Sequence, residues 1–109
     1  MGELPQPMLR VDHTRHADSH LISLVGEMDV GNVEEAREAV LSAIYSSDVD
    51  VIVDMSALEF IDSMGIAMLL ELQRISRADS DLLCFRGAHA EVAHILELTG
   101  VDQQLKFTD

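Results

Sequence analysis

Hydrophobic residues recur along the chain with two different periods, which predict strands and helices in alternation. Short apolar or β-branched runs predict strands at residues 8–12, 20–29, 49–55, 82–85 and 104–107. Apolar residues at helical spacing predict helices at residues 32–44, 63–77 and 90–99. The resulting order, β-β-α-β-α-β-α-β, predicts one α/β domain with helices packed on a single mixed sheet of four to five strands.

Particular residues mark where these elements begin and end. Gly26 is expected to start a turn after the second strand. Asn32 is expected to cap the first helix, with Glu35 completing a capping box, and Gly100 is expected to end the last helix. Both prolines fall within residues 1–7, which we expect to form a loose lead-in, so that residues 8–109 make up the domain.

The charge of the chain limits the partners that it can bind. Twenty acidic residues against seven basic ones give a formal net charge of −13. Such a surface offers no cationic footprint for nucleic acid, and it suits a basic protein partner or simply solubility. No apolar run reaches about 18 residues and the N-terminus lacks a signal-peptide pattern, so we expect no membrane span and a cytoplasmic location.

The sequence carries no motif for catalysis, cofactor binding or metal coordination. It has neither a P-loop nor a dinucleotide-binding glycine motif, and residues 62–66, DSMGI, lack the first glycine of a serine-hydrolase elbow. His13, His16 and His20 cluster without a cysteine or a helix to fix them, so we expect no metal site. Cys84, the single cysteine, lies in the apolar run LLCF and is expected to pack as a small hydrophobe. We expect no enzyme activity and no cofactor.

The segment FIDSMGIAMLLEL, residues 60–72, places an Asp-Ser pair at the start of a predicted helix. A serine here can cap the helix, accept a phosphate at the positive end of the helix dipole, or carry a covalent arm. The third use resembles the Asp-Ser-Leu segment of acyl carrier proteins, in which Ser63 would hold phosphopantetheine. Those proteins are helical bundles, and the β-branched runs of this chain argue against a bundle. Capping is the simplest use of Ser63.

Motifs over nearly the whole chain resemble the STAS family, which includes the anti-sigma factor antagonists of bacteria. The family typically shows a Gly-Glu-hydrophobic-Asp turn, an Asp-x-Ser-x-x-x-Phe-hydrophobic-Asp-Ser-Ser/Thr-Gly segment, and a Gly-hydrophobic pair after the third helix. The corresponding residues here are Gly26, Glu27, Met28 and Asp29, then Asp54, Ser56, Phe60, Ile61, Asp62, Ser63 and Gly65, then Thr99, Gly100 and Val101.

The resemblance implies a non-enzymatic partner switch. Such an antagonist binds an anti-sigma factor, often an ATP-binding serine kinase, and so controls sigma-factor-dependent transcription. The kinase phosphorylates the residue directly before the glycine, and a serine phosphatase removes the phosphate. The Asp of the turn, here Asp29, is implied to lie near that acceptor. The acceptor position itself is occupied by Met64, which has no hydroxyl group.

Three explanations of Met64 remain open. Ser63 could take the phosphate, one residue early. The domain could bind its partner constitutively, with Met64 as an adaptable apolar contact. It could also have lost the kinase partner and act as a scaffold or in a different partner-switching system. We favour constitutive or differently regulated binding over Ser63 phosphorylation, because one helical step turns Ser63 by about 100° from the next position.

Helical spacing extends the predicted partner-binding surface along one strip of this helix. Leu69 and Leu72 are expected to enter the core instead, and Met68 has equal claims to the core and to the strip. The predicted partner-binding residues are Asp29, Asp62, Ser63, Met64, Gly65, Ala67, Met68 and Glu71, with Ser63 as the alternative phosphate acceptor.

Overall fold

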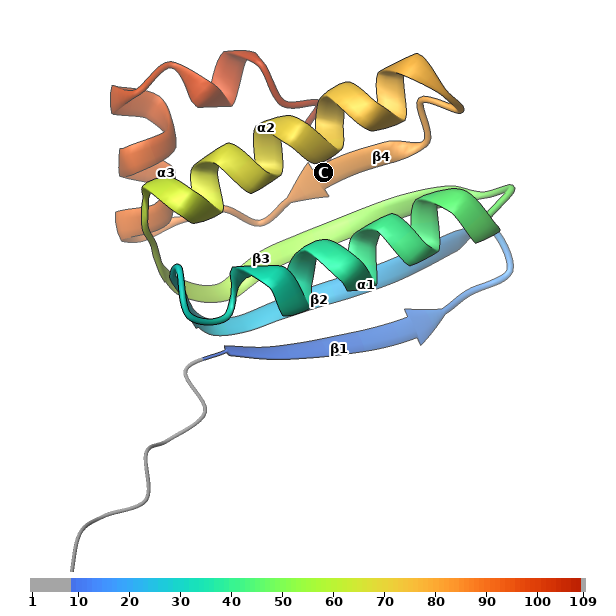
Figure 1. Cartoon of the computed structure of the whole chain (residues 1–109), viewed down its shortest axis with the longest axis horizontal. Coiled ribbons are helices and arrows are strands. Elements are labelled where there is room, and N and C mark those ends of the chain that lie inside the picture. Colours follow the sequence, from blue (N-terminus) through green and yellow to red (C-terminus); the bar gives the residue numbers. More distant parts are fainter. Residues whose placement is uncertain (1–8, 109) are drawn as a thin grey trace, which may run out of the picture.

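The computed structural model describes residues 9–108, and the proposed lead-in at residues 1–7 lies outside this part of the chain. Four strands and three α-helices alternate in the predicted order, and a short 3₁₀ helix follows them (Figure 1). The elements are β1 (Leu9–Arg15), β2 (Ser19–Met28), α1 (Val33–Ser46), β3 (Asp50–Ile61), α2 (Ser63–Ala78), β4 (Leu83–Arg86), α3 (Ala90–Leu98) and η1 (Val101–Gln103). The predicted single α/β domain is confirmed.

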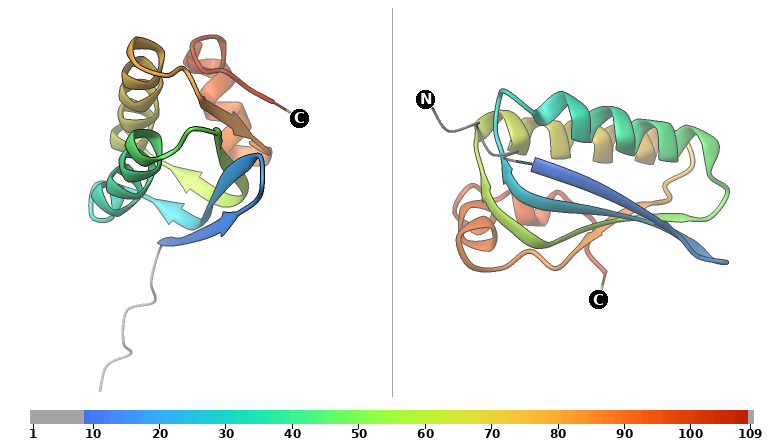
Figure 2. Two further views of the ribbon diagram at one scale, coloured as in Figure 1. Left: turned by 90° about the vertical axis from the view of Figure 1, so that its right-hand side faces the viewer. Right: turned by 90° about the horizontal axis from the view of Figure 1, so that it is seen from below.

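The four strands form one mixed sheet in the order β1-β2-β3-β4. Strand β1 is antiparallel to β2, whereas β2, β3 and β4 are parallel. Helices α1 and α2 lie side by side on one face of the sheet, and α3 covers part of the other face (Figure 2). The parallel strands end together, so the loops after β2 and β3 meet at the edge where α1 and α2 begin.

The second strand has the predicted length but contains no turn at Gly26, and the third strand is longer than the sequence pattern predicts. Gly26 was expected to start a turn, but β2 continues through it to Met28. Gly26 has φ of 108°, and the pairing with β3 shifts register on either side of it, so the glycine accommodates a bulge inside the strand. Strand β3 likewise runs beyond residue 55 to Ile61 and carries the predicted motif to the start of α2.

The C-terminal segment does not form the strand predicted at residues 104–107. Gly100, with φ of 77°, ends α3 as predicted, and the chain then turns into η1. Only an isolated bridge joins Phe107 to Phe85 of β4, with hydrogen bonds from Phe85 N to Lys106 O and from Thr108 N to Phe85 O, both of 2.8 Å. Gln104 N and Leu105 N still donate to Val101 O, at 2.9 and 3.2 Å, so the helical turn extends into the first half of the predicted strand.

The core lies between the sheet and the α1–α2 layer, and a smaller part lies under α3. Strand β2 contributes Ile22, Leu24 and Met28 to it, and α2 contributes Leu69 and Leu72 as predicted. Cys84 is also buried, and burial raises the pKa of its thiol. No helix of residues 9–108 is long and apolar enough to cross a membrane.

Candidate functional site: the loop and helix surface around Asp62

Asp62 is the residue on which the start of α2 depends. Its Oδ1 accepts hydrogen bonds from the backbone N–H groups of Met64 and Gly65, both at 3.0 Å. Its Oδ2 accepts a third, of 3.1 Å, from the backbone N–H of Val30. The N-cap of α2 is therefore Asp62, and the expectation that Ser63 caps the helix is wrong. A carboxylate fills this role well because it can accept from the helix and from the neighbouring loop at once.

Ser63 is the first helical residue, and its side chain is exposed. Because Asp62 supplies the cap, the argument that capping occupies the Ser63 hydroxyl no longer holds. The hydroxyl lies in the first turn of α2, where backbone N–H groups and the helix dipole favour an added negative charge.

The loop between β2 and α1 is held by hydrogen bonds among its own residues. Asn32 Oδ1 accepts from Asp29 N at 2.9 Å, and its Nδ2 donates to Glu27 O at 3.0 Å. The Asn32 side chain makes no cap bond to α1, so the predicted capping box with Glu35 is wrong. The amide instead closes the loop, because its donor and its acceptor both reach backbone groups that precede the helix.

This loop lies against the start of α2, which brings Asp29 and Asp62 to the same edge of the molecule. Asp62 N donates to Met28 O at 3.2 Å, directly before Asp29. The family resemblance implies that Asp29 lies near the residue that precedes Gly65, and Met28, directly before Asp29, pairs with Ile61 at the end of β3. The Asp29 carboxylate accepts a bond of 2.9 Å from Gly31 N, within its own loop.

Gly65 is buried, and it lets the start of α2 pack closely on the strands below. A Cβ at this position would lie 2.6 Å from Cγ1 of Ile61 and 3.2 Å from Cε of Met28. Gly65 is thus required for packing and offers no surface to a partner, although the sequence analysis had included it among the partner-binding residues. Its contribution to the site is to set the position of Met64 and Ser63.

Three large apolar side chains are exposed on the segments that meet at Asp62, which are the β2–α1 loop, the end of β3 and the start of α2. Met64 is 49% exposed, Phe60 44% and Val30 68%. Met64 is therefore no core residue. Val30 and Phe60 were missed as surface candidates, because Phe60 reads as a strand residue of the family motif and Val30 as a loop residue. We define the docking surface as Asp29, Val30, Phe60, Asp62, Ser63, Met64 and the exposed Ala67.

The strip predicted further along α2 is interrupted after Ala67. Met68 is only 4% exposed and belongs to the core, so its placement on the surface strip is wrong. The Glu71 carboxylate accepts two bonds from Arg37 of α1, of 3.0 and 2.9 Å. The hydrogen bonds from Arg37 lower the pKa of Glu71, although partial burial opposes this. Glu71 therefore joins the two helices and is not free for a partner in this arrangement.

Asp54 and Ser56, the other polar residues of the Asp-x-Ser segment, lie in the middle of β3 and form hydrogen bonds with each other and with neighbouring segments. Asp54 Oδ1 accepts from Ser56 N at 2.8 Å, and Arg86 of β4 approaches Asp54 Oδ2 at 3.4 Å. Burial alone would raise the pKa of Asp54, but the bonds from Ser56 and Arg86 outweigh it and the pKa is lowered. His89 Nε2 lies 2.6 Å from Ser56 O and ties in the start of α3. These motif residues connect β3 to β4 and to the start of α3.

The histidines of the first hairpin do not assemble a metal centre. The rings of His13 and His20 lie 5.7 Å apart on β1 and β2. Burial and the neighbouring His13 and Arg15 lower the pKa of His20. Within residues 9–108, no three side chains of His, Cys, Asp or Glu are placed to hold a metal ion together.

The mixed sheet, its helical layers and the exposed surface around Asp62 define a small α/β domain whose candidate site is a helix start flanked by loops. The STAS domain family model matches residues 10–109, and the chain belongs to this family. No curated protein sequence matches the chain. The predicted family and its fold are thereby confirmed.

Solved structures with the same fold include regulators of sigma factors. An anti-sigma factor antagonist from Mycobacterium paratuberculosis has a TM-score of 0.75 and 19% identity, over 95% of this chain and 89% of that one. A variant of RsbS from Moorella thermoacetica has a TM-score of 0.73 and 23% identity, over 91% and 86%. Phosphorylated SpoIIAA from Bacillus has a TM-score of 0.66 and 20% identity, over 93% and 91%. At these identities the likeness concerns the fold.

Proposed function

We propose that this STAS domain is a non-enzymatic anti-sigma factor antagonist or a related partner-switching regulator. In this role it binds an anti-sigma factor of the serine-kinase type through the docking surface. The observation that carries the proposal is the group of exposed apolar side chains, Val30, Phe60 and Met64, on the segments that meet at the acidic Asp62. Apolar residues inside a polar and charged border are typical of protein interfaces. The net charge of −13 favours a basic partner surface.

Constitutive binding follows from the side chain at position 64. SpoIIAA, which shares the fold, has been solved in unphosphorylated and phosphorylated forms, so this fold supports a phosphoswitch. In the family pattern, phosphate on the residue before the glycine adds about −1.5 to −2 charges at the interface and blocks binding. Met64 cannot be phosphorylated, and its exposed thioether adds apolar contact area instead. The kinase therefore has no acceptor at the usual position.

Met64→Asp tests whether the docking surface contacts the partner, because it places a carboxylate within that surface. This variant should weaken the complex by about 1–3 kcal/mol, because it places an unpaired charge in an apolar contact. Tyr45→Asp is the matched control, since Tyr45 is 66% exposed in the last turn of α1 and also apolar. Calorimetry should show both variants folded, with Tyr45→Asp slightly the less stable because its charge lies at the C-terminal end of α1, and binding should be weaker for Met64→Asp alone. Equal affinities of the two variants would place the interface elsewhere.

Met64→Ser tests whether the absence of a hydroxyl at residue 64 is what prevents regulation by phosphorylation. Met64→Ser should become phosphorylated at residue 64 by a cognate serine kinase with ATP, and it should then dissociate from its partner. The wild type should show neither change. Pull-down followed by mass spectrometry identifies the kinase-type partner and maps the modified residue in one experiment. A partner without kinase features would favour the scaffold alternative.

Ser63 phosphorylation is the second candidate, because the structure frees the Ser63 hydroxyl from capping. Phosphate on Ser63 would still lie in the first turn of α2, beside Asp62 and within the docking surface. Stoichiometric phosphate on Ser63 with loss of binding, both abolished in Ser63→Ala, would make the protein a switch with a shifted acceptor. The acyl-carrier alternative is excluded by the fold, because a four-stranded sheet replaces the helical bundle.

A further inference from the structure

A polar groove lies on the far half of α2, away from the docking surface. It has a volume of about 470 Å³ and opens between α2 and the segment around η1. Four α2 residues line one wall at helical spacing, and two glutamines line the other: Leu70, Gln73, Arg74, Arg77, Gln103 and Gln104. This volume is within the range of small-molecule sites, roughly 300–1,000 Å³.

The charge inside the groove differs from that of the protein as a whole. The chain carries seven basic residues against twenty acidic ones, and two of the seven, Arg74 and Arg77, line this groove. Among the residues that the structure describes, no carboxylate lines the groove or lies within ion-pair distance of either arginine. By contrast, Arg37, Arg86 and Lys106 each pair with an acidic side chain. The groove thus brings together two arginines that make no ion pair, and Glu71 interacts with Arg74 only at longer range.

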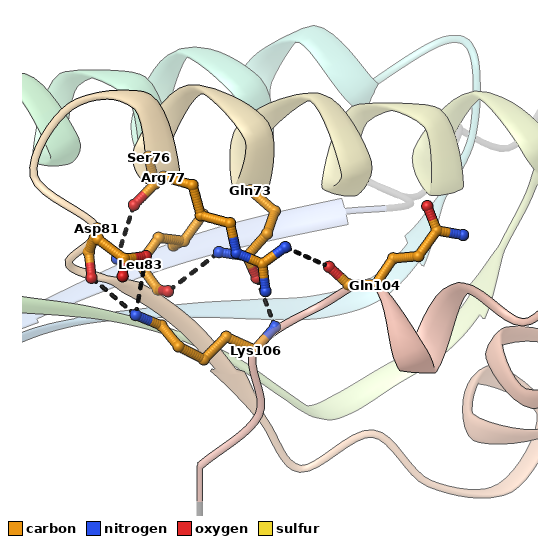
Figure 3. A network of polar contacts seen from close by, with 7 residues as sticks. All are labelled: Gln73, Ser76, Arg77, Asp81, Leu83, Gln104 and Lys106. Atoms are coloured by element: carbon orange, nitrogen blue, oxygen red, sulfur yellow. Dashed lines mark hydrogen bonds and ion pairs between the residues drawn. The ribbon is translucent and has the colours of Figure 1, made fainter.

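The walls of the groove are fixed before any ligand binds (Figure 3). Gln73 is 1% exposed, and its side chain donates to Leu83 O at 3.3 Å and accepts from Lys106 N at 2.6 Å. Ser76 Oγ accepts from Leu83 N at 3.0 Å. Arg77 itself donates through Nη1 to Gln104 O at 3.0 Å and so spans from one wall to the other. A preformed site of this kind loses little conformational entropy on binding.

We propose that this groove binds a small polyanion with two neighbouring phosphate or carboxylate groups through Arg74 and Arg77. Residues three apart on a helix have Cβ atoms about 5–6 Å apart, so the two guanidinium groups can each engage one of two neighbouring oxyanion groups. Phosphate and carboxylate groups share this planar, bidentate recognition. The Gln103 and Gln104 amides can bond to uncharged polar atoms of the ligand, and Leu70 provides an apolar contact. A monoanion would engage only one of the two arginines.

The test is a titration of the full chain followed by NMR, with pyrophosphate and citrate as separate probes. Saturable shifts of the Gln103 and Gln104 resonances are expected, with a Kd between about 10 µM and 1 mM. Saturation by pyrophosphate alone, or by citrate alone, identifies the phosphate or the carboxylate as the preferred group. Inorganic phosphate at the same concentration should bind at least about tenfold more weakly than the better probe.

Matched charge variants separate the groove from the overall charge. Arg74→Gln should weaken binding of the better probe about tenfold or more, because it removes one of the two guanidinium groups. The variant should still fold, since Arg74 makes no ion pair with a described residue. Arg15→Gln removes the same charge from an exposed residue of β1 and should leave the Kd unchanged. The proposal is overturned if neither probe saturates by about 20 mM, or if both variants weaken binding equally.

Discussion

The two ends of α2 use polar side chains in opposite ways, although one helix carries both. At its N-terminal end, a single side chain, Asp62, satisfies three backbone N–H groups and leaves its apolar neighbours exposed. In its C-terminal half, Gln73 and Ser76 are buried and hydrogen-bonded to β4 and to the C-terminal segment. The first arrangement leaves a surface free for contact. The second arrangement stabilises the fold, because buried polar groups are costly to leave unpaired.

The largest effect is expected at the C-terminal half. Gln73→Ala should lower the free energy of unfolding by about 2–4 kcal/mol, because it leaves Leu83 O and Lys106 N without their partner and opens a small cavity. Gln103→Ala, an exposed residue of the same groove, should change stability by less than about 0.5 kcal/mol. Urea unfolding of both variants measures the difference. Similar values for the two would mean that the network adds no stability.

The next effect concerns the close packing at the N-terminal end. Gly65→Ala should destabilise the protein by about 1–3 kcal/mol, because the new Cβ would lie 2.6 Å from Cγ1 of Ile61. Gly31→Ala is the control, since its Cβ would meet only Asp29 Oδ1, at 3.3 Å. Thermal unfolding should therefore show a clear loss for Gly65→Ala and a much smaller change for Gly31→Ala. A tolerated alanine at residue 65 would mean that Ile61 can move aside.

Sequence patterns predicted one end of α2 better than the other. The start of the helix follows from Asp62 and the family motif, and its predicted range of 63–77 differs from the observed Ser63–Ala78 by a single residue. The burial of Gln73 and Ser76 was missed, because polar residues are normally assigned to the solvent face. A signal was present, since Gln73 lies four residues after Leu69 and Ser76 lies four residues after Leu72, on the buried face. Their partners come from segments distant in sequence, which no local pattern reveals.

The strand ends were harder to predict for a related reason. The run from 49 to 55 is strongly β-branched, whereas the rest of β3 mixes polar residues with buried Leu58 and Ile61. Pairing with β2, through the bulge at Gly26, extends the strand to the edge where the docking surface forms. The exposure of Val30 and Phe60 depends on that edge. It could not be inferred before the register of the two strands was known.

A third effect tests the Asp62 cap. Asp62→Ala should cost about 1–2 kcal/mol, because it removes an N-cap acceptor and the bond to Val30 N. Asp62→Asn keeps one side-chain acceptor and should cost less. Amide hydrogen exchange should increase at Val30, Met64 and Gly65 in the alanine variant, while the C-terminal half of α2 stays protected. Increased exchange along the whole helix would contradict the view that its two ends are stabilised separately.

The smallest effect belongs to the ion pair of Arg37 with Glu71, between the two ends. Because the bonds from Arg37 lower the pKa of Glu71 below its ordinary value of 4.5, the ionised carboxylate stabilises the folded state above that pH. This contribution should disappear as the pH falls through the lowered pKa, since protonated Glu71 no longer pairs. Glu71→Gln should therefore differ from the wild type in urea midpoint at about pH 7, and the difference should shrink as the pH is lowered below 4.5.

A double-mutant cycle assigns this pH dependence to the pair itself. In an Arg37→Gln background, Glu71→Gln should shift the urea midpoint little anywhere in this pH range, because the positive partner is already absent. The pair is partly exposed and screened by solvent, so its contribution stays below that of the cap and of the buried network. A difference between Glu71→Gln and the wild type that persists at the low end of this range would arise from lost packing between α1 and α2, and not from charge.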